Sequence, residues 1–275
     1  MNYTMNNPKP LRSATGRERL SKVLRVSREL ITVDDVVAAL DVSRRKAALM
    51  LARWMRQGWL TRIKRGLYAP IPIGAASKEQ VLSDPLMVVP QLFEPGYVGG
   101  WTAAEHWDLT EQIFRGIRVF TTRTVRAQNV RFQNVPFLLK HVRSSTLFGL
   151  RSIWRERIKI QISDPHKTII DMLDDPKVGG GIRHVESCLS AYFDSKHLNT
   201  EILLGYAIKQ GNGAVFKRLG FLASRLREQD KILQTACAKH LTEGNARLDP
   251  SQPADRLMTR WKLWVPEGWQ SGTKE

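Results

Sequence analysis

Two apolar stripes with helical spacing lie close together near the start of the chain. Residues 33–40 and 47–54 each place apolar side chains three and four positions apart, as one buried face of a helix requires. Thr32 and Ser43 stand before these segments, where N-cap residues are favoured, and Gly58 follows the second, where a left-handed cap is common. Only two residues separate the first segment from the second N-cap. The pattern therefore predicts a helix, a tight turn and a second helix.

A short β-hairpin is predicted directly after the second helix. Residues 59–63 and 67–69 are rich in apolar and β-branched side chains, and they flank Lys64, Arg65 and Gly66 at a cationic tip. A helix-turn-helix followed by a basic hairpin is the layout of a winged helix-turn-helix. This layout points to duplex DNA as a partner.

Cations at the start of the second helix predict the DNA contacts. Three basic residues in a first turn are unfavourable for the helix dipole, and an anionic partner would remove that penalty. We expect Arg44 and Arg45 to contact bases or phosphates, and Lys46 and the wing to contact phosphates or the minor groove. Two structural alternatives are a solvated basic face and a helix-turn-helix that docks a protein. The predicted DNA-binding set is Ser43, Arg44, Arg45, Lys46, Arg53, Lys64 and Arg65.

The sequence on either side of this motif sets the predicted domain limits. Residues 17–28 form an amphipathic helix, whose Leu20, Val23 and Leu24 are expected to pack beneath the motif. After Tyr68, a Pro-, Gly- and Ala-rich stretch breaks regular structure and places a boundary near residue 75. We expect a flexible N-terminal arm, a winged helix-turn-helix DNA-binding domain and a C-terminal α/β domain, over residues 1–16, 17–75 and 76–275.

The C-terminal domain is predicted to begin mixed and to become helical. Residues 85–89 start a helix or a strand, and residues 102–107 form a short helix. Asp164 caps a further helix, and apolar stripes from Gly181 onward predict a series of helices. The fold class is therefore α+β, with a winged helix-turn-helix followed by a mixed α/β domain that has a helical C-terminal part. Strands are expected at 118–122, 135–142 and 158–162, and the tail tryptophans Trp261, Trp264 and Trp269 are expected to be core anchors.

Positive charge is concentrated in two blocks. The chain has 43 Lys or Arg against 26 Asp or Glu, a net charge of +17. Residues 1–72 hold 15 cations and 5 acids, and residues 112–160 hold 11 and 1. So uneven a block usually faces a polyanion. We expect the second block to extend the DNA footprint or to meet RNA or an acidic protein, with a solvated surface as the alternative.

Composition also excludes several classes of protein. No apolar run approaches the ~20 residues of a membrane span, and the N-terminus lacks the apolar core of a secretory signal. Cys188 and Cys237 lie far apart without a CxxC or Cys/His cluster, so we expect buried thiols and no zinc site. These observations predict a cytoplasmic protein with no membrane partner and no cofactor.

No catalytic constellation is convincing, and we expect that the protein is not an enzyme. The three glycines at 179–181 lack the Lys-Ser/Thr of a phosphate-binding loop, and the six histidines are scattered. A metal-dependent nuclease, which needs clustered carboxylates near a lysine, remains a minor alternative on Asp171, Asp174, Asp175 and Lys177.

Four stretches of the chain resemble one known family. They are RIKRGLY at 62–68, GGWTAAEHWDLT at 99–110, SDPHKTIID at 163–171 and KRLGFL at 217–222. In this order and spacing the chain resembles AbiE-type antitoxins, the antitoxins of abortive-infection, type IV toxin–antitoxin systems that act in phage defence.

The resemblance implies two roles for the chain. The winged helix of such antitoxins represses their own operon by binding inverted repeats in its promoter, through residues here matched by Arg44, Arg45, Lys46, Lys64 and Arg65. The C-terminal domain counteracts a nucleotidyltransferase-like toxin encoded beside it, without requiring a stable complex. A monomer that binds paired sites cooperatively is one expectation for this protein. A stand-alone winged-helix transcription factor and a DNA-processing nuclease remain as rival functions.

Overall fold

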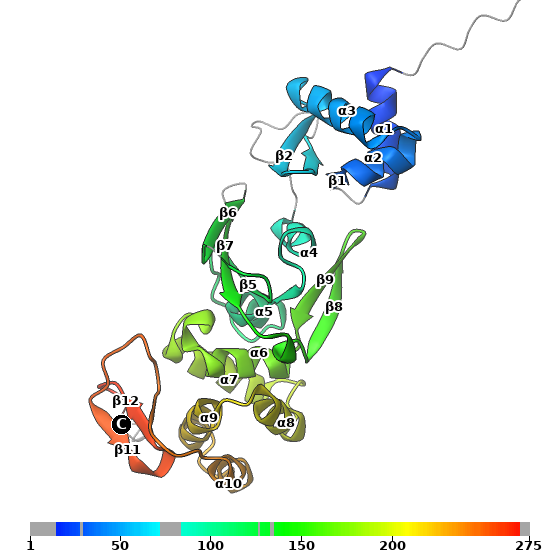
Figure 1. Ribbon diagram of the computed structural model, residues 1–275. Helices are drawn as coiled ribbons and strands as arrows, with labels where there is room; N and C mark the ends of the chain where they lie inside the picture. Colours follow the sequence, from blue (N-terminus) through cyan, green and yellow to red (C-terminus); the bar gives the residue numbers. More distant parts are fainter. Residues whose placement is uncertain (1–14, 28–29, 72–83, 126, 133–134, 270–275) are drawn as a thin grey trace, which may run out of the picture. The chain divides into compact units, whose positions relative to one another are not determined.

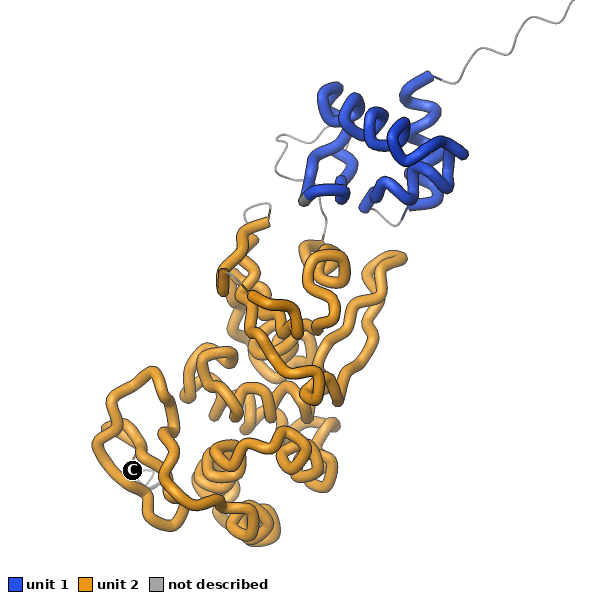
Figure 2. Tube along the Cα trace, in the orientation of Figure 1, with its two compact units in different colours: residues 1–83 blue, residues 84–275 orange. Residues whose placement is uncertain are grey.

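The chain folds into two compact units, residues Met1–Ser83 and Asp84–Glu275 (Figure 2). The computed structural model describes residues 15–27, 30–71, 84–125, 127–132 and 135–269, apart from the side chain of Lys64. Most of the predicted N-terminal arm and the predicted boundary near residue 75 lie outside the described residues. Each unit has a hydrophobic core of its own.

Unit 1 combines three helices with a small sheet (Figure 1). Thr15 and Glu18 form a capping box at the start of its first helix, and Thr32 and Asp35 form another at the start of the second. The helix-turn-helix and the wing are therefore confirmed. The elements are α1 (Gly16–Val26), α2 (Val33–Leu40) and α3 (Arg44–Arg56), with β1 (Ile31–Thr32), β2 (Leu60–Lys64) and β3 (Leu67–Pro70).

The core of unit 1 lies between the three helices. Val36 and Leu51 are fully buried, and Trp54 is almost so. Leu20 and Val23 join this core from α1, as predicted. The prediction for Leu24 was wrong, because this side chain is 37% exposed. Leu24 directly follows Val23, so it points about a quarter-turn further round the helix, to the edge of the buried face.

The wing sheet has a third strand that the sequence did not predict. Its order is β1-β3-β2, and β3 pairs antiparallel with both neighbours. In β1, Ile31 lies opposite Tyr68 and Thr32 lies opposite Leu67. Thr32 also caps α2. One residue thus joins the wing to the helix-turn-helix.

Unit 2 is built on a six-stranded mixed sheet with the order β6-β7-β5-β4-β9-β8 (Figure 1). The pairs β5–β7 and β4–β9 are parallel, and the other three pairs are antiparallel. Three strands were predicted, and the other three were missed because they are short or lie at a solvated edge. The strands are β4 (Gly96–Val98), β5 (Ile117–Thr121), β6 (Asn129–Phe132), β7 (Val135–His141), β8 (Leu150–Arg155) and β9 (Ile158–Ser163).

Helix α6 is the central helix of unit 2. It contacts α5, α7, α8 and α9 as well as β9, and most of its side chains are buried. Asp164 caps it as predicted, because the Asp164 carboxylate accepts a hydrogen bond from Lys167 N at 2.8 Å. The segment at 85–89 is helical, in a 3₁₀ turn (Pro85–Val88) followed by α4. The helices are α4 (Val89–Phe93), α5 (Gly100–His106), α6 (Pro165–Asp174), α7 (Ile182–Asp194), α8 (Thr200–Gln210), α9 (Gly213–Leu226) and α10 (Lys231–Lys239).

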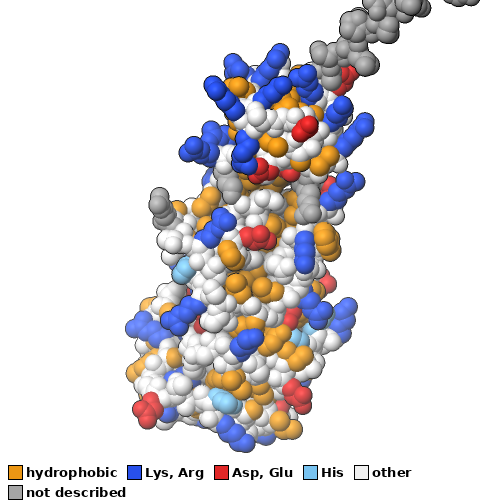
Figure 3. Space-filling view, turned by 45° about the vertical axis from the view of Figure 1, so that its right-hand side comes forward, with side chains coloured by type: hydrophobic (Ala, Val, Ile, Leu, Met, Phe, Trp, Pro, Cys, Tyr) orange, Lys and Arg blue, Asp and Glu red, His pale blue; other side chains and the backbone are white. Residues whose placement is uncertain are grey.

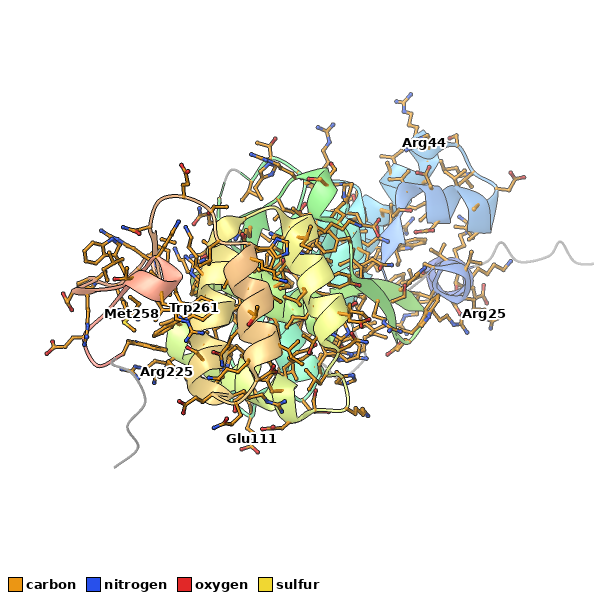
Figure 4. The ribbon with its side chains drawn as sticks, turned by 90° about the horizontal axis from the view of Figure 1, so that it is seen from below. Arg25, Arg44, Glu111, Arg225, Met258 and Trp261 are labelled. Carbon is orange, nitrogen blue, oxygen red and sulfur yellow. The ribbon has the colours of Figure 1, made fainter. Side chains whose placement is uncertain are left out.

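The tail forms a second small sheet that packs on α9. Its strands β10 (Ala246–Arg247), β11 (Arg256–Met258) and β12 (Leu263–Val265) have the order β10-β12-β11. Trp261 and Trp269 are buried anchors, as predicted, whereas Trp264 is 37% exposed. A Cβ on Gly220 of α9 would lie 2.1 Å from the Trp261 ring, so the close approach of the tail requires this glycine. Figure 4 labels Trp261 and Met258 in this tail segment.

The predicted α+β fold class is confirmed, with the tail sheet added after the helices. Among the described residues, no helix is both long and apolar enough to cross a membrane.

Candidate nucleic-acid interface

The turn between α2 and α3 is held by two local devices. Asp41 ends α2 in the left-handed conformation, with φ 50°. Ser43 Oγ accepts a hydrogen bond from Lys46 N at 3.3 Å and caps α3, as predicted. Gly58 follows α3 with φ 73°, which also agrees with the prediction. These caps fix where α3 begins and ends, and so which side chains stand at its N-terminus.

One face of α3 is anchored in the core and the other faces solvent. Ala47, Leu51 and Trp54 are buried against α1 and α2. At 100° per residue, the direction opposite this stripe passes through Arg45 and Arg56, and both are exposed. The surface opposite the core is therefore basic along the length of the helix.

The first turn of α3 holds three exposed cations and no acid. Arg44, Arg45 and Lys46 are all exposed. Arg44 forms a salt bridge with Asp34 of α2, although both side chains are about 70% exposed. Arg45 and Lys46 have no salt bridge within the described residues. Figure 4 shows Arg44 on the side of unit 1 opposite Arg25 of α1. The structure thus separates Arg44, held by an acid, from its two neighbours.

The sequence analysis missed an apolar residue in the middle of this basic face. Leu49 is 65% exposed, one turn after Arg45 and one turn before Arg53. Arg56, which was not in the predicted set, is exposed on the same face. Helical spacing alone could have found both, because each lies opposite the buried stripe. Leu49 carries no charge, so a pattern of cations alone does not identify it.

The wing places further cations beside α3 in the same unit. Arg65 and Arg62 are exposed, and Gly66 turns the hairpin with φ 83°. Lys64 belongs to β2, and its side chain is outside the described part of the structure. Of the predicted set, Ser43 is a cap, while Arg44, Arg45, Lys46, Arg53 and Arg65 are exposed cations of unit 1.

The carboxylates considered for a nuclease are engaged in contacts within the fold. Asp171 is 2% exposed and forms a salt bridge with Lys167, and it accepts a hydrogen bond from Tyr97 Oη at 2.9 Å. Burial raises the pKa of Asp171, against the opposing effect of Lys167. Asp174 and Asp175 both hold Lys140, with N–O distances of 3.4 and 3.0 Å. In the described ranges, no three His, Cys, Asp or Glu side chains gather as metal ligands.

The second basic block is split between structural and exposed cations. Arg118 lies over the Trp101 ring at 4.3 Å and is 6% exposed, and burial lowers its pKa to about 10. Lys140 is held by the acid pair at the end of α6, and Arg155 forms a salt bridge with Asp84 at 2.9 Å. Among the described residues of the block, the exposed cations are Arg115, Arg123, Arg131, Arg143, Arg151, Arg157 and Lys159.

Comparison with known proteins finds a family model that matches part of the N-terminal unit. The model of a family described as transcriptional regulator, AbiEi antitoxin, matches residues 18–71. No curated protein matches the chain. The crystal structure of the RV2827C protein from Mycobacterium tuberculosis is similar in fold, with 16% identity, a TM-score of 0.62 and 92% of each chain covered.

The family match and the geometry concern the same residues. The matched segment 18–71 spans α1 to β3, including the exposed face of α3 and the wing. The resemblance to AbiE-type antitoxins is thereby confirmed over the winged helix, and a DNA-binding transcriptional regulator agrees with the basic surface found there. Over residues 18–71, this chain is similar to transcriptional regulators of the AbiEi antitoxin type.

Proposed function

We propose that the protein is the antitoxin of a type IV toxin–antitoxin system and represses its own operon. Unit 1 would bind inverted repeats in the promoter, and unit 2 would neutralise a nucleotidyltransferase-like toxin in the cytoplasm. The observation that carries the DNA part is the exposed basic face of α3 within a domain that matches AbiEi regulators.

The geometry of unit 1 suggests how the contacts divide. Arg45 stands at the N-terminal end of the face opposite the core, where a recognition helix meets base edges in the major groove. Lys46 and Arg53 flank that face and would reach phosphates. The tip of the wing, with Lys64 and Arg65, would lie along the neighbouring backbone or minor groove.

Arg44 has a different position from Arg45 in this proposal. Its guanidinium is held by Asp34, so it must leave an acid before it can meet a phosphate or a base. An exposed pair of this kind is worth about 0–1 kcal/mol, which DNA can replace. Arg44 would therefore add less net affinity than Arg45.

A gel-shift titration tests the proposal, using the full chain, the DNA upstream of its own gene and a scrambled duplex of equal length. We expect tight binding in two steps on the upstream DNA and weak binding on the scrambled duplex. The double variant Arg44→Ala, Arg45→Ala should lose the preference and keep its thermal unfolding profile. Arg25→Ala is the matched control, because Arg25 lies on another side of the same unit (Figure 4). Equal, weak binding to both duplexes would overturn the repressor part.

The antitoxin part needs a separate experiment. The protein encoded beside this gene would be expressed from an inducible promoter, in cells that do or do not also express the full chain. Growth should stop without the full chain and resume with it, and the Arg44→Ala, Arg45→Ala variant should rescue as well as the wild type. Failure of the full chain to restore growth would overturn this part and leave a stand-alone transcription factor.

A further inference from the structure

The β8–β9 ribbon of unit 2 carries an exposed aromatic side chain within the second basic block. Trp154 is 61% exposed. In the antiparallel register it lies opposite Lys159, and Ser152 lies opposite Gln161. These four side chains therefore share one face of the ribbon. Gln161 Nε2 donates to Ser152 Oγ over 3.1 Å, which fixes the second pair.

The other face of the ribbon is already occupied by the fold. Ile158 and Ile160 are buried there, and Arg155 is held by Asp84. The strand β8 is the end of the sheet order, so its pairing partner is β9 alone among the described strands. Figure 1 shows the two strands as a ribbon at one edge of the sheet. The face with Trp154 is the one left open to a partner.

The charge around Trp154 is positive. Arg157 stands at the two-residue turn and is exposed, whereas the exposed Arg151 lies opposite Ile162, on the other face of the ribbon. Neither residue, nor Lys159, forms a salt bridge with the described residues. Glu156 is the single acid in residues 112–160. Lys140 and Arg155 of the same block are paired with acids, whereas Arg157 and Lys159 are not paired within the described residues. The ribbon therefore presents an aromatic ring close to cations that no acid neutralises.

We propose that this face of the β8–β9 ribbon binds single-stranded nucleic acid. One base would stack on the Trp154 indole, and the phosphates on either side would meet Lys159 and Arg157. A ring for the bases and cations for the backbone are the two features that single-strand binding surfaces combine. A duplex would use only the cations, because its base faces are stacked inside the helix. An acidic peptide would satisfy the charge but leave the indole without a planar partner.

The face that carries Trp154 continues past Ser152 and Gln161 toward the rest of the sheet. Gln161 also lines a shallow hollow of about 490 Å³, together with Leu150, Arg123 and the acidic Glu94. A second nucleotide could follow the first into this hollow only with its phosphate beside Arg123, because Glu94 would repel it. The site is in unit 2 and is independent of promoter recognition by unit 1, so the two proposals can fail separately.

Fluorescence anisotropy with a labelled 12-nucleotide oligo(dT), and with the same backbone carrying abasic sites, tests the proposal on the full chain. The ratio of the two dissociation constants isolates base stacking, because phosphate contacts in either unit contribute to both probes. We expect the wild type to bind oligo(dT) at least about fivefold more tightly than the abasic strand, the lower end of one stacked base. Trp154→Ala should bring the ratio close to one, and Trp154→Phe should restore most of it.

Two further variants keep the interpretation sharp. Lys159→Gln should weaken both probes and reduce the salt dependence, since it removes a phosphate contact. Trp264→Ala removes another exposed tryptophan of unit 2 and should leave the ratio unchanged. A ratio near one for the wild type, or an unchanged ratio in Trp154→Ala, would overturn the proposal. If Trp154→Ala keeps the oligo(dT) preference but changes the oligomeric state of the protein in solution, the ring belongs to an interface between copies. That result would also overturn the proposal.

Discussion

The basic surface of unit 1 and the basic block of unit 2 have similar net charge but use it differently. In unit 1, Arg45 and Arg56 of α3 stand opposite a buried stripe, and Arg44 is the cation of the first turn that an acid holds. In unit 2, Arg118, Lys140 and Arg155 are committed to a ring or to carboxylates. Figure 3 shows Lys and Arg dense on the visible face of unit 1 and more mixed with acids and apolar groups on unit 2. A count of charges therefore does not indicate how many are available to a partner.

The largest expected effect comes from removing a cation that is part of the fold. Lys167 is fully buried, paired with Asp171 and hydrogen bonded to Gln210 Oε1 at 3.1 Å. Lys167→Met should lower the free energy of unfolding of unit 2 by about 3–5 kcal/mol, because it leaves a buried carboxylate without its partner. Urea unfolding followed by circular dichroism measures this loss. Lys159→Met, an exposed control, should change stability by no more than about 0.5 kcal/mol. Similar losses for both would contradict the distinction between buried and exposed cations.

The next effect concerns binding rather than stability. Arg45→Ala should weaken binding to the upstream DNA by about 1–3 kcal/mol, roughly 5- to 150-fold, as expected for a base contact. Arg44→Ala should weaken it less, because Arg44 must first leave Asp34. Titration at fixed salt with each single variant measures the difference. A larger loss for Arg44 would mean that its pair with Asp34 positions it for DNA instead of competing with DNA.

A smaller effect is expected at the apolar centre of the same face. Leu49 would contact a thymine methyl in the major groove, so Leu49→Ala should weaken binding by about 0.8 kcal/mol or slightly more, near fourfold. Replacing operator thymines by deoxyuridine one at a time removes single methyl groups. At the contacted base this should weaken the wild type and leave Leu49→Ala unaffected. If no substitution distinguishes the two proteins, Leu49 makes no such contact.

The smallest expected effect is an absence of reaction. Cys188 and Cys237 are free and buried, and burial raises the pKa of each thiol to about 12. A maleimide at pH 7.5 should leave both unmodified in the folded protein and label both in urea, as mass spectrometry would show. Rapid labelling of one thiol without denaturant would indicate that unit 2 opens locally around it.

Sequence reasoning succeeded where the determining residues are close in the chain. The caps at Thr32, Ser43 and Asp164 and the turn at Gly58 lie within four residues of what they hold, so their local chemistry identified them. The buried stripe of α3 repeats at a regular spacing and was found for the same reason. The winged helix was therefore predictable almost completely.

The missed features depend on contacts that are distant in sequence or on strands without a clear period. Lys140 contacts two acids that lie 34 and 35 residues later, and Arg118 of β5 contacts Trp101 of α5, on the far side of a loop. Strands β6 and β8 lie at the two ends of the sheet, where polar side chains hide the alternation. The DNA-binding role of the predicted set and the toxin partner remain proposals, because local pattern specifies a surface and not its occupant.

Thr32 takes part in two elements of unit 1 and thereby helps to fix the distance between α3 and the wing. This residue caps α2, which packs against α3, and it also pairs with β3 of the wing, so the two helices and the wing belong to one packed frame. If α3 and the wing both contact DNA, their fixed separation makes binding depend on the spacing of the contacted base pairs as well as on their sequence. Inserting a single base pair between the positions they touch would rotate one of the two elements off its site by about a tenth of a helical turn. If unit 1 binds an operator as proposed, that operator should tolerate a changed base more readily than a changed length.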